Sequence, residues 1–248
     1  RVKVLAADFT KPIVEGLARE IGQVEYILHL GAETHVDNSI ENPRPFVYSN
    51  VVGTMEMLEF AKTQKRLKRF VYFSTDEVFG PAPEGVHYKE WDRYNSTNPY
   101  SASKAGGEEL ALAYANTYAL PVCVTHTMNV FGERQHPEKF IPKVIRQVLA
   151  GEKVLIHANK EKTKAGSRFW IHARNVANAL NFLLDRAEFL LRNLNPILLV
   201  HGDEHFNRHE GINSEVFHEK SGIGNLVGAA LGDLGDEASY FAADLLRR

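Results

Sequence analysis

The chain has 248 residues, of which 44% are hydrophobic and 24% are charged, proportions that are ordinary for a globular protein. Its formal net charge of −2 excludes an overall basic field that would attract nucleic acid, and no apolar stretch approaches the roughly 20 residues needed to cross a membrane. Because it has one cysteine and no recognisable signal peptide, we expect no internal disulfide, and a cytoplasmic location is the default.

Short apolar runs alternate with amphipathic helical patterns through residues 1–130. We expect strands where the apolar runs lie, at residues 2–7, 24–30, 70–73 and 121–127. We expect helices at residues 12–21, 46–61 and 101–118, and a loop rich in Pro, Gly and charge at 81–97. Such alternation is typical of βαβ units with a parallel sheet covered on both faces. The sequence therefore predicts a doubly wound α/β, Rossmann-like domain over residues 1–130.

The pattern changes after residue 130 and indicates a smaller C-terminal lobe over residues 131–248. In this lobe we expect helices at residues 137–150 and 170–184, with strands at 153–156 and 197–200. Residues 202–224 are polar and have no clear period, so no element is predicted there.

Polar residues follow the predicted strands of the first domain at the point where each strand ends. They are Asp8, the segment from His29 to Thr34, the segment from Ser74 to Glu77 and the segment from Thr127 to Asn129. In parallel α/β sheets, ligands collect at the carboxyl ends of the strands. This coincidence favours a functional site at that edge, although helix caps and turns use some of the same residue types.

Tyr100 and Lys104 are four residues apart on a predicted helix and therefore share one face, a turn apart. A tyrosine with an ordinary pKa near 10 is a poor base at neutral pH. A nearby ammonium favours the phenolate, so we expect Lys104 to lower the pKa of Tyr100. The same spacing also arises by chance at the start of amphipathic helices, so the position of the pair between two strands matters more than the spacing itself.

That position, after a strand ending in Thr75-Asp76-Glu77 and before the next strand, resembles the extended short-chain dehydrogenase/reductase family. In that family the Tyr-Lys pair and a Ser/Thr at the preceding strand end serve nicotinamide-dependent oxidation of a sugar hydroxyl. The resemblance implies NAD as the cofactor and a nucleotide sugar as the substrate. It also implies a homodimer in which the helices near residues 46–65 and 101–118 pack as a four-helix bundle.

The segment Ser74–Gly80 separates chemistries within the family. It is similar to the Ser-Thr-Asp-Glu-Val-Tyr-Gly of dTDP-glucose 4,6-dehydratases and their UDP-glucose relatives, with Phe79 in place of the tyrosine. Decarboxylases carry Ser in place of the Asp, and simple 4-epimerases carry small or neutral residues. Elimination of water across C5 and C6 needs a base and an acid whose pKa values are held apart. The resemblance implies five catalytic residues: Glu77 as the C5 base, Asp76 as the acid at O6, Thr75 as a hydrogen-bond partner of O4, Tyr100 and Lys104.

Further stretches resemble the parts of the family that hold the cofactor and the nucleotide. Leu30–Ser39 is similar to Leu-Ala-Ala-Glu-Ser-His-Val-Asp-x-Ser, and Asn129–Gly132 with Pro137–Pro142 is similar to Asn-Asn-Tyr-Gly followed by Pro-Glu-Lys-Leu-Ile-Pro. By this resemblance the cofactor contacts are Asp8, Phe9, Leu30, Gly31, Ala32, Thr34, Ser49, Ser74, Tyr100 and Lys104. The substrate contacts are Thr34, Thr75, Asn129, Glu138, Lys139 and Arg168. No metal ligand is implied.

The sequence departs from the family in three places. No Gly-x-x-Gly-x-x-Gly turn precedes Asp8, so we expect that the chain either lacks roughly the first βαβ unit or does not hold the cofactor in the usual way. The Pro-Gly-His-Asp-x-Arg segment of the substrate lobe is not found after residue 185, and Asn175 stands where relatives carry Asp. A truncated or inactive paralogue, or another epimerase or decarboxylase of the family, therefore remain alternatives to a dehydratase.

A zinc hydrolase is a further alternative, because His201–His205 matches His-x-x-Glu-His. That motif needs a helix to bring both imidazoles to one zinc ion. Gly202 and Asp203, directly after the strand expected at 197–200, argue against a helix and favour a His-rich loop.

The sequence thus predicts NAD-dependent dehydration of a nucleoside-diphosphate glucose to its 4-keto-6-deoxy derivative, with dTDP-glucose favoured as the substrate.

Overall fold

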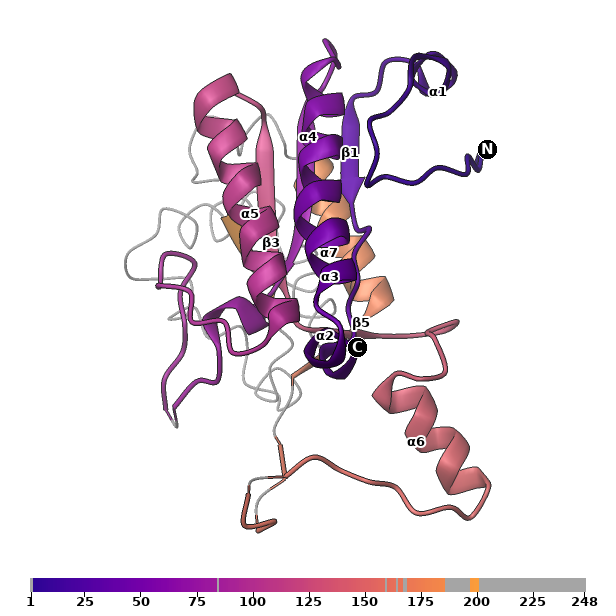
Figure 1. Ribbon diagram of the computed structural model, residues 1–248, viewed down its shortest axis with the longest axis vertical. Coiled ribbons are helices and arrows are strands. Elements are labelled where there is room, and N and C mark those ends of the chain that lie inside the picture. Colours follow the sequence, from indigo (N-terminus) through magenta and orange to yellow (C-terminus); the bar gives the residue numbers. More distant parts are fainter. Residues whose placement is uncertain are drawn as a thin grey trace, which may run out of the picture. The chain divides into compact units, whose positions relative to one another are not determined.

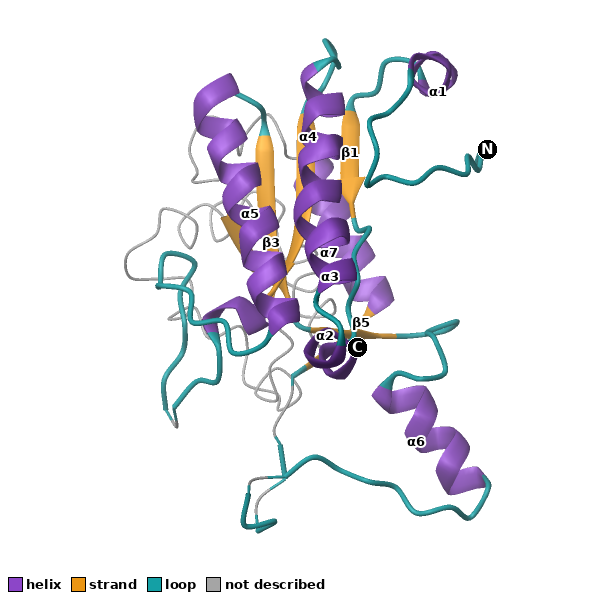
Figure 2. Cartoon of the chain, in the orientation of Figure 1, coloured by secondary structure: helices purple, strands orange, loops and turns teal. Residues whose placement is uncertain are grey.

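A computed structural model describes residues 2–83, 85–158, 160–163, 165–166, 169–185 and 197–200 of the chain (Figure 1). The described residues form two compact units. The first contains the residues up to Thr127 together with 184–185 and 197–200, and the second contains the described part of Met128–Leu183. Helices and strands alternate through the first unit, as Figure 2 shows.

The first unit is built on a parallel sheet in which the described strands follow the order β1-β2-β3-β6. These strands are Tyr26–His29 (β1), Arg69–Thr75 (β2), Val122–Thr127 (β3) and Ile197–Val200 (β6). Because all of them are parallel, their carboxyl ends lie at one edge of the sheet, where Thr75 is opposite Thr127. β2 and β3 are buried along nearly their whole length, as expected for the central strands of a parallel sheet.

Two long helical segments pack side by side against this sheet (Figure 1). The first runs without a break from α3 (Arg44–Val47) through a π-helical turn (η1, Tyr48–Val52) into α4 (Gly53–Lys62), and the second is α5 (Pro99–Tyr118). Two shorter helices, α1 (Glu15–Ile21) and α2 (Val36–Glu41), precede them. The core between the helices and the sheet includes six side chains that are at most 2% exposed: Leu58, Phe70, Tyr72, Ala111, Val122 and Val124.

The close approach of α5 to the π-helical turn depends on Gly107. A Cβ atom placed on Gly107 would overlap the Asn50 carbonyl oxygen and the Tyr72 hydroxyl. The backbone of α5 therefore lies directly against η1. Single π-helical turns inside longer helices are frequent at functional sites, so this contact marks a region of interest.

The start of α5 is fixed by a capping box. The Asn98 side chain accepts a hydrogen bond from Ser101 N at 2.8 Å, and the Ser101 hydroxyl oxygen accepts one from Asn98 N at 3.3 Å. Pro99 follows as the first helical residue, where its fixed φ suits the helix and its missing N–H costs nothing. Tyr100 and Lys104 thereby occupy the first two turns of α5.

The second unit contains a two-stranded parallel sheet and two helices. In chain order these are β4 (Asn129–Phe131), α6 (Phe140–Leu149), β5 (Trp170–His172) and α7 (Ala173–Asp185), and β4 pairs with β5. The Phe140 ring stacks on the Trp170 ring at a centroid distance of 5.8 Å, and Phe131 meets Trp170 edge-on at 6.5 Å. Aromatic packing thus joins α6 to the small sheet.

The parallel α/β arrangement confirms the predicted fold class. The strands expected at 24–30, 70–73, 121–127 and 197–200 are present, as are the helices expected at 46–61 and 101–118 and the loop at 81–97. The helices expected from residues 12 and 137 begin three residues later, at Glu15 and Phe140. Within the described part of the chain, no helix combines the length and apolar character needed to cross a membrane.

Two expected strands are wrong. Residues 2–7 form no strand: Val2 and Val4 are 89% and 88% exposed, and no described strand pairs with them. Residues 153–156 are likewise not a strand, and Leu155 is 85% exposed. The helix expected at 170–184 is present as α7, which begins three residues later because residues 170–172 form β5. An apolar run becomes a strand only where another strand supplies backbone partners and a core covers its side chains.

Candidate active site

The end of β2 carries the expected acid and base residues. Thr75 is the last residue of the strand, and its hydroxyl oxygen accepts from Glu77 N at 3.3 Å, which caps a 3-10 helix (η2, Asp76–Phe79). Gly80 ends this helix with a φ of 75°, and a Cβ atom there would overlap the Asn95 carbonyl oxygen. Asp76 and Glu77 therefore occupy the first turn of η2, directly beyond the strand.

Tyr100 reaches the same end of β2 from the first turn of α5. The Thr75 side chain acts on its phenol and favours the ionised form. The backbone N of Tyr100 donates to Ser39 Oγ at 3.1 Å, which fixes the turn that carries the phenol. The Thr75 hydroxyl donates to Asp76 Oδ1 at 3.2 Å. One threonine hydroxyl thus connects the tyrosine to the acid.

The pKa of Tyr100 lies above its ordinary value. Burial is the main cause, and the charges of Glu77 and Asp76 raise this pKa further, while the hydrogen bond with Thr75 lowers it. The expectation that Lys104 lowers the pKa of Tyr100 is therefore wrong for this arrangement of side chains. The charges that act on the phenol are those of two carboxyl groups, Glu77 and Asp76.

Lys104 directs its ammonium at the backbone of β2. Its Nζ donates to the Phe73 carbonyl oxygen and lies 4.4 Å from the centre of the Tyr72 ring. The side chain is 4% exposed, and burial lowers the pKa of Lys104 to about 8, while the charge of Glu108 acts in the opposite direction. Lys104 is thus one helical turn from Tyr100, as the spacing predicted, with its charge held against the strand.

Glu77 is held by the residue that caps α5. Asn98 Nδ2 donates to Glu77 Oε2 at 3.3 Å, while Asn98 Oδ1 accepts from Ser101 N. Asn98 was not among the residues that the sequence indicated for the site. A signal for it exists in the sequence, because an Asn followed by Pro99 is typical of a helix N-cap and stands two residues before Tyr100.

The loop after β1 contains four of the expected cofactor contacts, Leu30, Gly31, Ala32 and Thr34. The backbone of Glu33 in this loop makes two hydrogen bonds with the Asn50 side chain, at 2.9 Å from its N and at 3.0 Å to its O. Asn50 Nδ2 also donates to Ser103 Oγ at 2.8 Å. Asn50 is 1% exposed and therefore joins the loop to α5 from inside the protein.

Phe9 lies against the same loop. A Cβ atom on Gly31 would come within 2.9 Å of the Phe9 ring, and one on Gly53 within 2.5 Å. Asp8 Oδ1 accepts from Thr10 N at 2.9 Å and from Thr10 Oγ1 at 2.7 Å, and these bonds lower the pKa of Asp8. Asp8 and Phe9 are thus next to the carboxyl end of β1, although no strand leads to them.

Ser74 and Ser49 are the remaining expected cofactor contacts of the first unit. Ser74 is 5% exposed, and its hydroxyl has no hydrogen-bond partner within the described part of the chain. A buried hydroxyl without a partner costs about 1–3 kcal/mol, so this position favours a ligand that brings a polar group. Ser49 lies on η1, beside Asn50, and is partly exposed.

The expected substrate contacts are divided between the two units. Thr34 and Thr75 are in the first unit, while Asn129, Glu138 and Lys139 are in the second. Asn129 Nδ2 donates to Phe169 O at 3.2 Å, Glu138 pairs with His136 at 3.5 Å, and Lys139 precedes α6. Arg168 and the His201–His205 motif lie outside the described residues. Among the residues that are described, no group of three or more His, Cys, Asp or Glu side chains could hold a metal ion.

Comparison with known proteins gives a family and a fold. The model of the NAD dependent epimerase/dehydratase family matches residues 2–193. A trifunctional UDP-glucose 4,6-dehydratase, UDP-4-keto-6-deoxy-D-glucose 3,5-epimerase and UDP-4-keto-L-rhamnose reductase from Arabidopsis thaliana is 39% identical over 167 residues, which cover 66% of this chain and 24% of that protein. A dTDP-glucose 4,6-dehydratase from Streptomyces venezuelae, solved with NAD bound, has a TM-score of 0.65 at 30% identity, over 78% of this chain and 65% of that chain.

A UDP-glucose 4-epimerase from Thermus thermophilus, solved with NAD, is similar to the same degree. Its TM-score is 0.67 at 27% identity, over 79% of this chain and 62% of that chain. The fold is therefore shared by dehydratases and epimerases. The chain spans between 24% and 54% of the length of the curated relatives that it matches.

Proposed function

Because this chain belongs to the NAD-dependent epimerase/dehydratase family, we propose that it dehydrates a nucleoside-diphosphate glucose to the 4-keto-6-deoxy derivative. The favoured substrate is dTDP-glucose. One observation carries the proposal: Asp76 and Glu77 occupy the first turn of η2, at the strand end where Tyr100 is joined to Thr75. Oxidation of a sugar hydroxyl needs only the tyrosine, whereas elimination of water needs an acid and a base as well.

Tyr100 takes the proton from O4 in this proposal, with Thr75 as the hydrogen-bond partner of the same oxygen. The charges of Asp76 and Glu77 raise the pKa of Tyr100 and so oppose formation of the phenolate. An Asp76 that carries a proton, as an acid at O6 must, removes one of these charges. The protonation states of Tyr100 and Asp76 are therefore coupled. When Asp76 is protonated, as elimination requires, its charge no longer opposes the Tyr100 phenolate, and Tyr100 takes the O4 proton more readily.

Glu77 removes the proton from C5 once C4 is a ketone. The electron pair of the C5–H bond forms a C5–C6 double bond, the C6–O bond breaks, and Asp76 gives its proton to the departing oxygen, which leaves as water. Asn98 Nδ2 holds Glu77 Oε2 and so orients the carboxylate for this step. Glu77 then returns its proton to C5. NAD, when bound, supplies the hydride acceptor at C4 and the hydride donor at C6, so the reaction has no net redox change.

The residues around this strand end fit NAD. The buried Ser74 hydroxyl lacks a partner among the described residues and can bond a polar group of a ligand. Lys104, one turn from Tyr100, is the residue that would hold ribose hydroxyls. The small residues Gly31 and Ala32 allow a ligand to approach the backbone of the loop after β1. We place the adenine near Asp8 and Phe9, which flank the same loop.

We assign the cofactor to residues 1–130, and the nucleotide part of the substrate to Asn129 together with Glu138, Lys139 and Arg168 of residues 131–248. We also propose a homodimer through the helices near residues 46–65 and 101–118. Exposed apolar side chains on these helices support it, because Val47, Tyr48 and Tyr118 are 49%, 61% and 50% exposed. The proposed location is the cytoplasm, which suits the free, buried Cys123 thiol.

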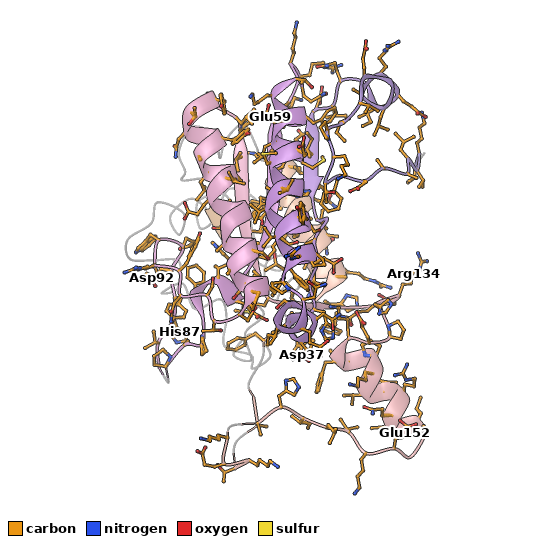
Figure 3. The ribbon with its side chains drawn as sticks, viewed as in Figure 1. Asp37, Glu59, His87, Asp92, Arg134 and Glu152 are labelled. Carbon is orange, nitrogen blue, oxygen red and sulfur yellow. The ribbon has the colours of Figure 1, made fainter. Side chains whose placement is uncertain are left out.

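Incubation of the protein with NAD and either dTDP-glucose or UDP-glucose tests the proposal, with the 4-keto product as the readout. Glu77→Gln is expected to stop elimination while oxidation at C4 stays detectable as reduced cofactor. Glu152→Gln, at an exposed carboxylate labelled in Figure 3, is the matched control and is expected to behave as the wild type. Absence of product with both glucose nucleotides contradicts the dehydratase proposal, and so does undiminished elimination by Glu77→Gln.

A further inference from the structure

A buried polar cluster that the proposed reaction does not use joins α5 to β3. Glu108 on α5 and His126 on β3 are both 0% exposed, and Glu108 Oε1 lies 2.9 Å from His126 Nε2. Tyr94, from the loop that precedes α5, donates its hydroxyl to the same Glu108 oxygen. Burial and the charge of Glu108 raise the pKa of Tyr94 above its ordinary value, so its hydroxyl keeps the proton that it donates.

Stability alone is a poor explanation for this cluster. Burying a carboxylate and an imidazole is unfavourable unless their partners compensate for the lost water. Glu108 Oε2 and both ring nitrogens of His126 make no hydrogen bond in the described part of the chain, although Nε2 lies 2.9 Å from Glu108 Oε1, so the compensation there is incomplete. Apolar side chains of similar volume often fill such a site at lower cost. The cluster is better explained by the segments that it holds in place.

One of those segments is η2, which carries Asp76 and Glu77. Phe79, the last residue of η2, packs its ring on the His126 ring at a centroid distance of 4.8 Å and meets the Tyr94 ring edge-on at 5.4 Å. The cluster therefore fixes the end of η2, just as the Thr75 cap fixes its start.

The second segment is the loop from Gly80 to Thr97. Asn95 N, next to Tyr94, donates to Val78 O at 2.9 Å and so ties the returning loop to η2. Figure 3 shows this loop, with His87 and Asp92 labelled, projecting to the side of α5. Glu108 belongs to the same helix as Tyr100, about two turns further along. A single carboxylate thus connects the helix that carries Tyr100 to the segment that carries Asp76 and Glu77.

We propose that Glu108 is a positioning residue that, through Tyr94 and His126, fixes η2 and its two carboxyl groups relative to Tyr100. The effect on turnover rests on the proposed function, whereas the effect on the loop does not. Misplacement of a reacting group by about 1 Å can slow a reaction on the order of 10²-fold. Elimination needs both carboxyl groups, so it is expected to suffer more than oxidation at C4.

Tyr94→Phe is the variant that tests this proposal, because it removes the hydroxyl that bonds Glu108 and keeps the ring that Phe79 contacts. The matched control is Tyr114→Phe. Tyr114 is on α5, the helix that carries Glu108. Its hydroxyl donates to Glu59 Oε1 at 2.5 Å, and Glu59, on α4, is labelled in Figure 3. Each variant therefore removes one tyrosine–glutamate hydrogen bond of α5, but only Tyr94→Phe acts on the cluster.

With dTDP-glucose and NAD, Tyr94→Phe is expected to lower kcat at least about tenfold and to change KM by less than about twofold. Reduced cofactor is expected to accumulate during turnover, because elimination slows more than oxidation. Tyr114→Phe is expected to match the wild type in all three quantities. An equal kcat for the two variants overturns the proposal, as does a loss of kcat without accumulation of reduced cofactor.

A readout that needs no turnover separates this inference from the proposed function. Lys89 and Arg93 are exposed in the loop, so the rate of trypsin cleavage after them reports how firmly the loop is held. Tyr94→Phe is expected to speed cleavage roughly fivefold, and Glu108→Gln to act in the same direction. Cleavage of both variants at the wild-type rate overturns the positioning role. Absence of product from the wild type, by contrast, contradicts only the proposed function.

Discussion

Asn98 donates from its side-chain amide to Glu77 Oε2 at 3.3 Å, and its side-chain oxygen accepts from Ser101 N at 2.8 Å. One side chain therefore starts α5 and orients the carboxylate proposed as the C5 base. Tyr100 is only two residues further along the helix. The position of the proposed base and that of the proposed proton acceptor are thus both set by the residue at which α5 begins.

Asn98→Asp is expected to separate the two roles of this side chain. Asp caps helices about as well as Asn, so the free energy of unfolding is expected to stay within about 0.5 kcal/mol of the wild type. The N–H that holds Glu77 is lost and a like charge replaces it, so product formation is expected to slow at least about tenfold. Urea denaturation and product assays measure the two effects. Asn98→Ala, which removes the cap as well, is expected to cost about 1 kcal/mol in addition. Wild-type product formation by Asn98→Asp contradicts this assignment.

Glu77→Gln is expected to lower the pKa of Tyr100. The charge of Glu77 raises that pKa in the wild type, so its removal lets the phenol ionise at lower pH. Titration of ring-labelled tyrosines by NMR measures the change, with Tyr100→Phe identifying the signal. Glu152→Gln is expected to leave the titration as it is in the wild type. An identical titration in Glu77→Gln and the wild type would show that the charge of Glu77 does not raise the pKa of Tyr100.

His29 is expected to make the protein sensitive to mild acid. Burial, together with a smaller effect of the Lys104 charge, lowers the pKa of His29 from 6.5 to about 4. The unfolded chain therefore binds more protons between these values, so stability is complete above pH 6.5 and falls by about 3 kcal/mol as the pH drops toward 4. His29→Gln, whose amide can bond Thr54 Oγ1 as His29 Nε2 does at 3.1 Å, is expected to lose less over this window.

The control for this pH effect is His87→Gln, at an exposed histidine of the loop before α5. Its free energy of unfolding is expected to follow the wild-type dependence on pH. Urea denaturation at several pH values between 4 and 7 measures all three proteins. A wild type and a His29→Gln variant with the same dependence would rule out the assignment to His29.

Two neighbouring glycines of α5 are expected to respond differently to alanine. In Gly107→Ala the new Cβ overlaps the Asn50 carbonyl oxygen and the Tyr72 hydroxyl, so α5 must shift, at a cost of about 1–3 kcal/mol. In Gly106→Ala the new Cβ meets only Val51 Cγ2 at 3.2 Å. The better helix propensity of alanine offsets this contact, and the free energy of unfolding is expected to stay within about 1 kcal/mol of the wild type. Equal losses in the two variants would contradict the close contact between α5 and η1.

The strands that the sequence predicts correctly differ from the others in what surrounds them. Residues 70–73 and 121–127 are apolar runs that pair with each other at the centre of the sheet. Residues 2–7 and 153–156 have a similar local composition, yet no described strand lies beside them. Pairing between distant segments decides whether an apolar run becomes a strand, and a local sequence pattern does not show which segments will pair.

The candidate site shows the same division between local and distant information. Thr75–Glu77 and Tyr100 could be brought together from the sequence, because each stands at the end of a strand or at the start of the following helix. The direction of the Lys104 side chain could not be predicted, because a spacing of four residues fixes only the face of the helix. It does not indicate that the ammonium donates to the Phe73 carbonyl oxygen. The contacts of Asn98 with Glu77 and of Glu108 with His126 join separate elements and leave no local signal.

The 3-10 helix η2 begins directly after Thr75, the last residue of β2. The directions of its side chains therefore depend on where the strand ends. With 3.0 residues per turn, each residue is rotated by about 120° from the one before it. One residue inserted between Thr75 and Asp76 would swing both carboxyl groups by about a third of a turn, and one inserted after Glu77 would turn Phe79 away from His126. Evolving sequences can therefore exchange side chains in this segment far more readily than they can change its length.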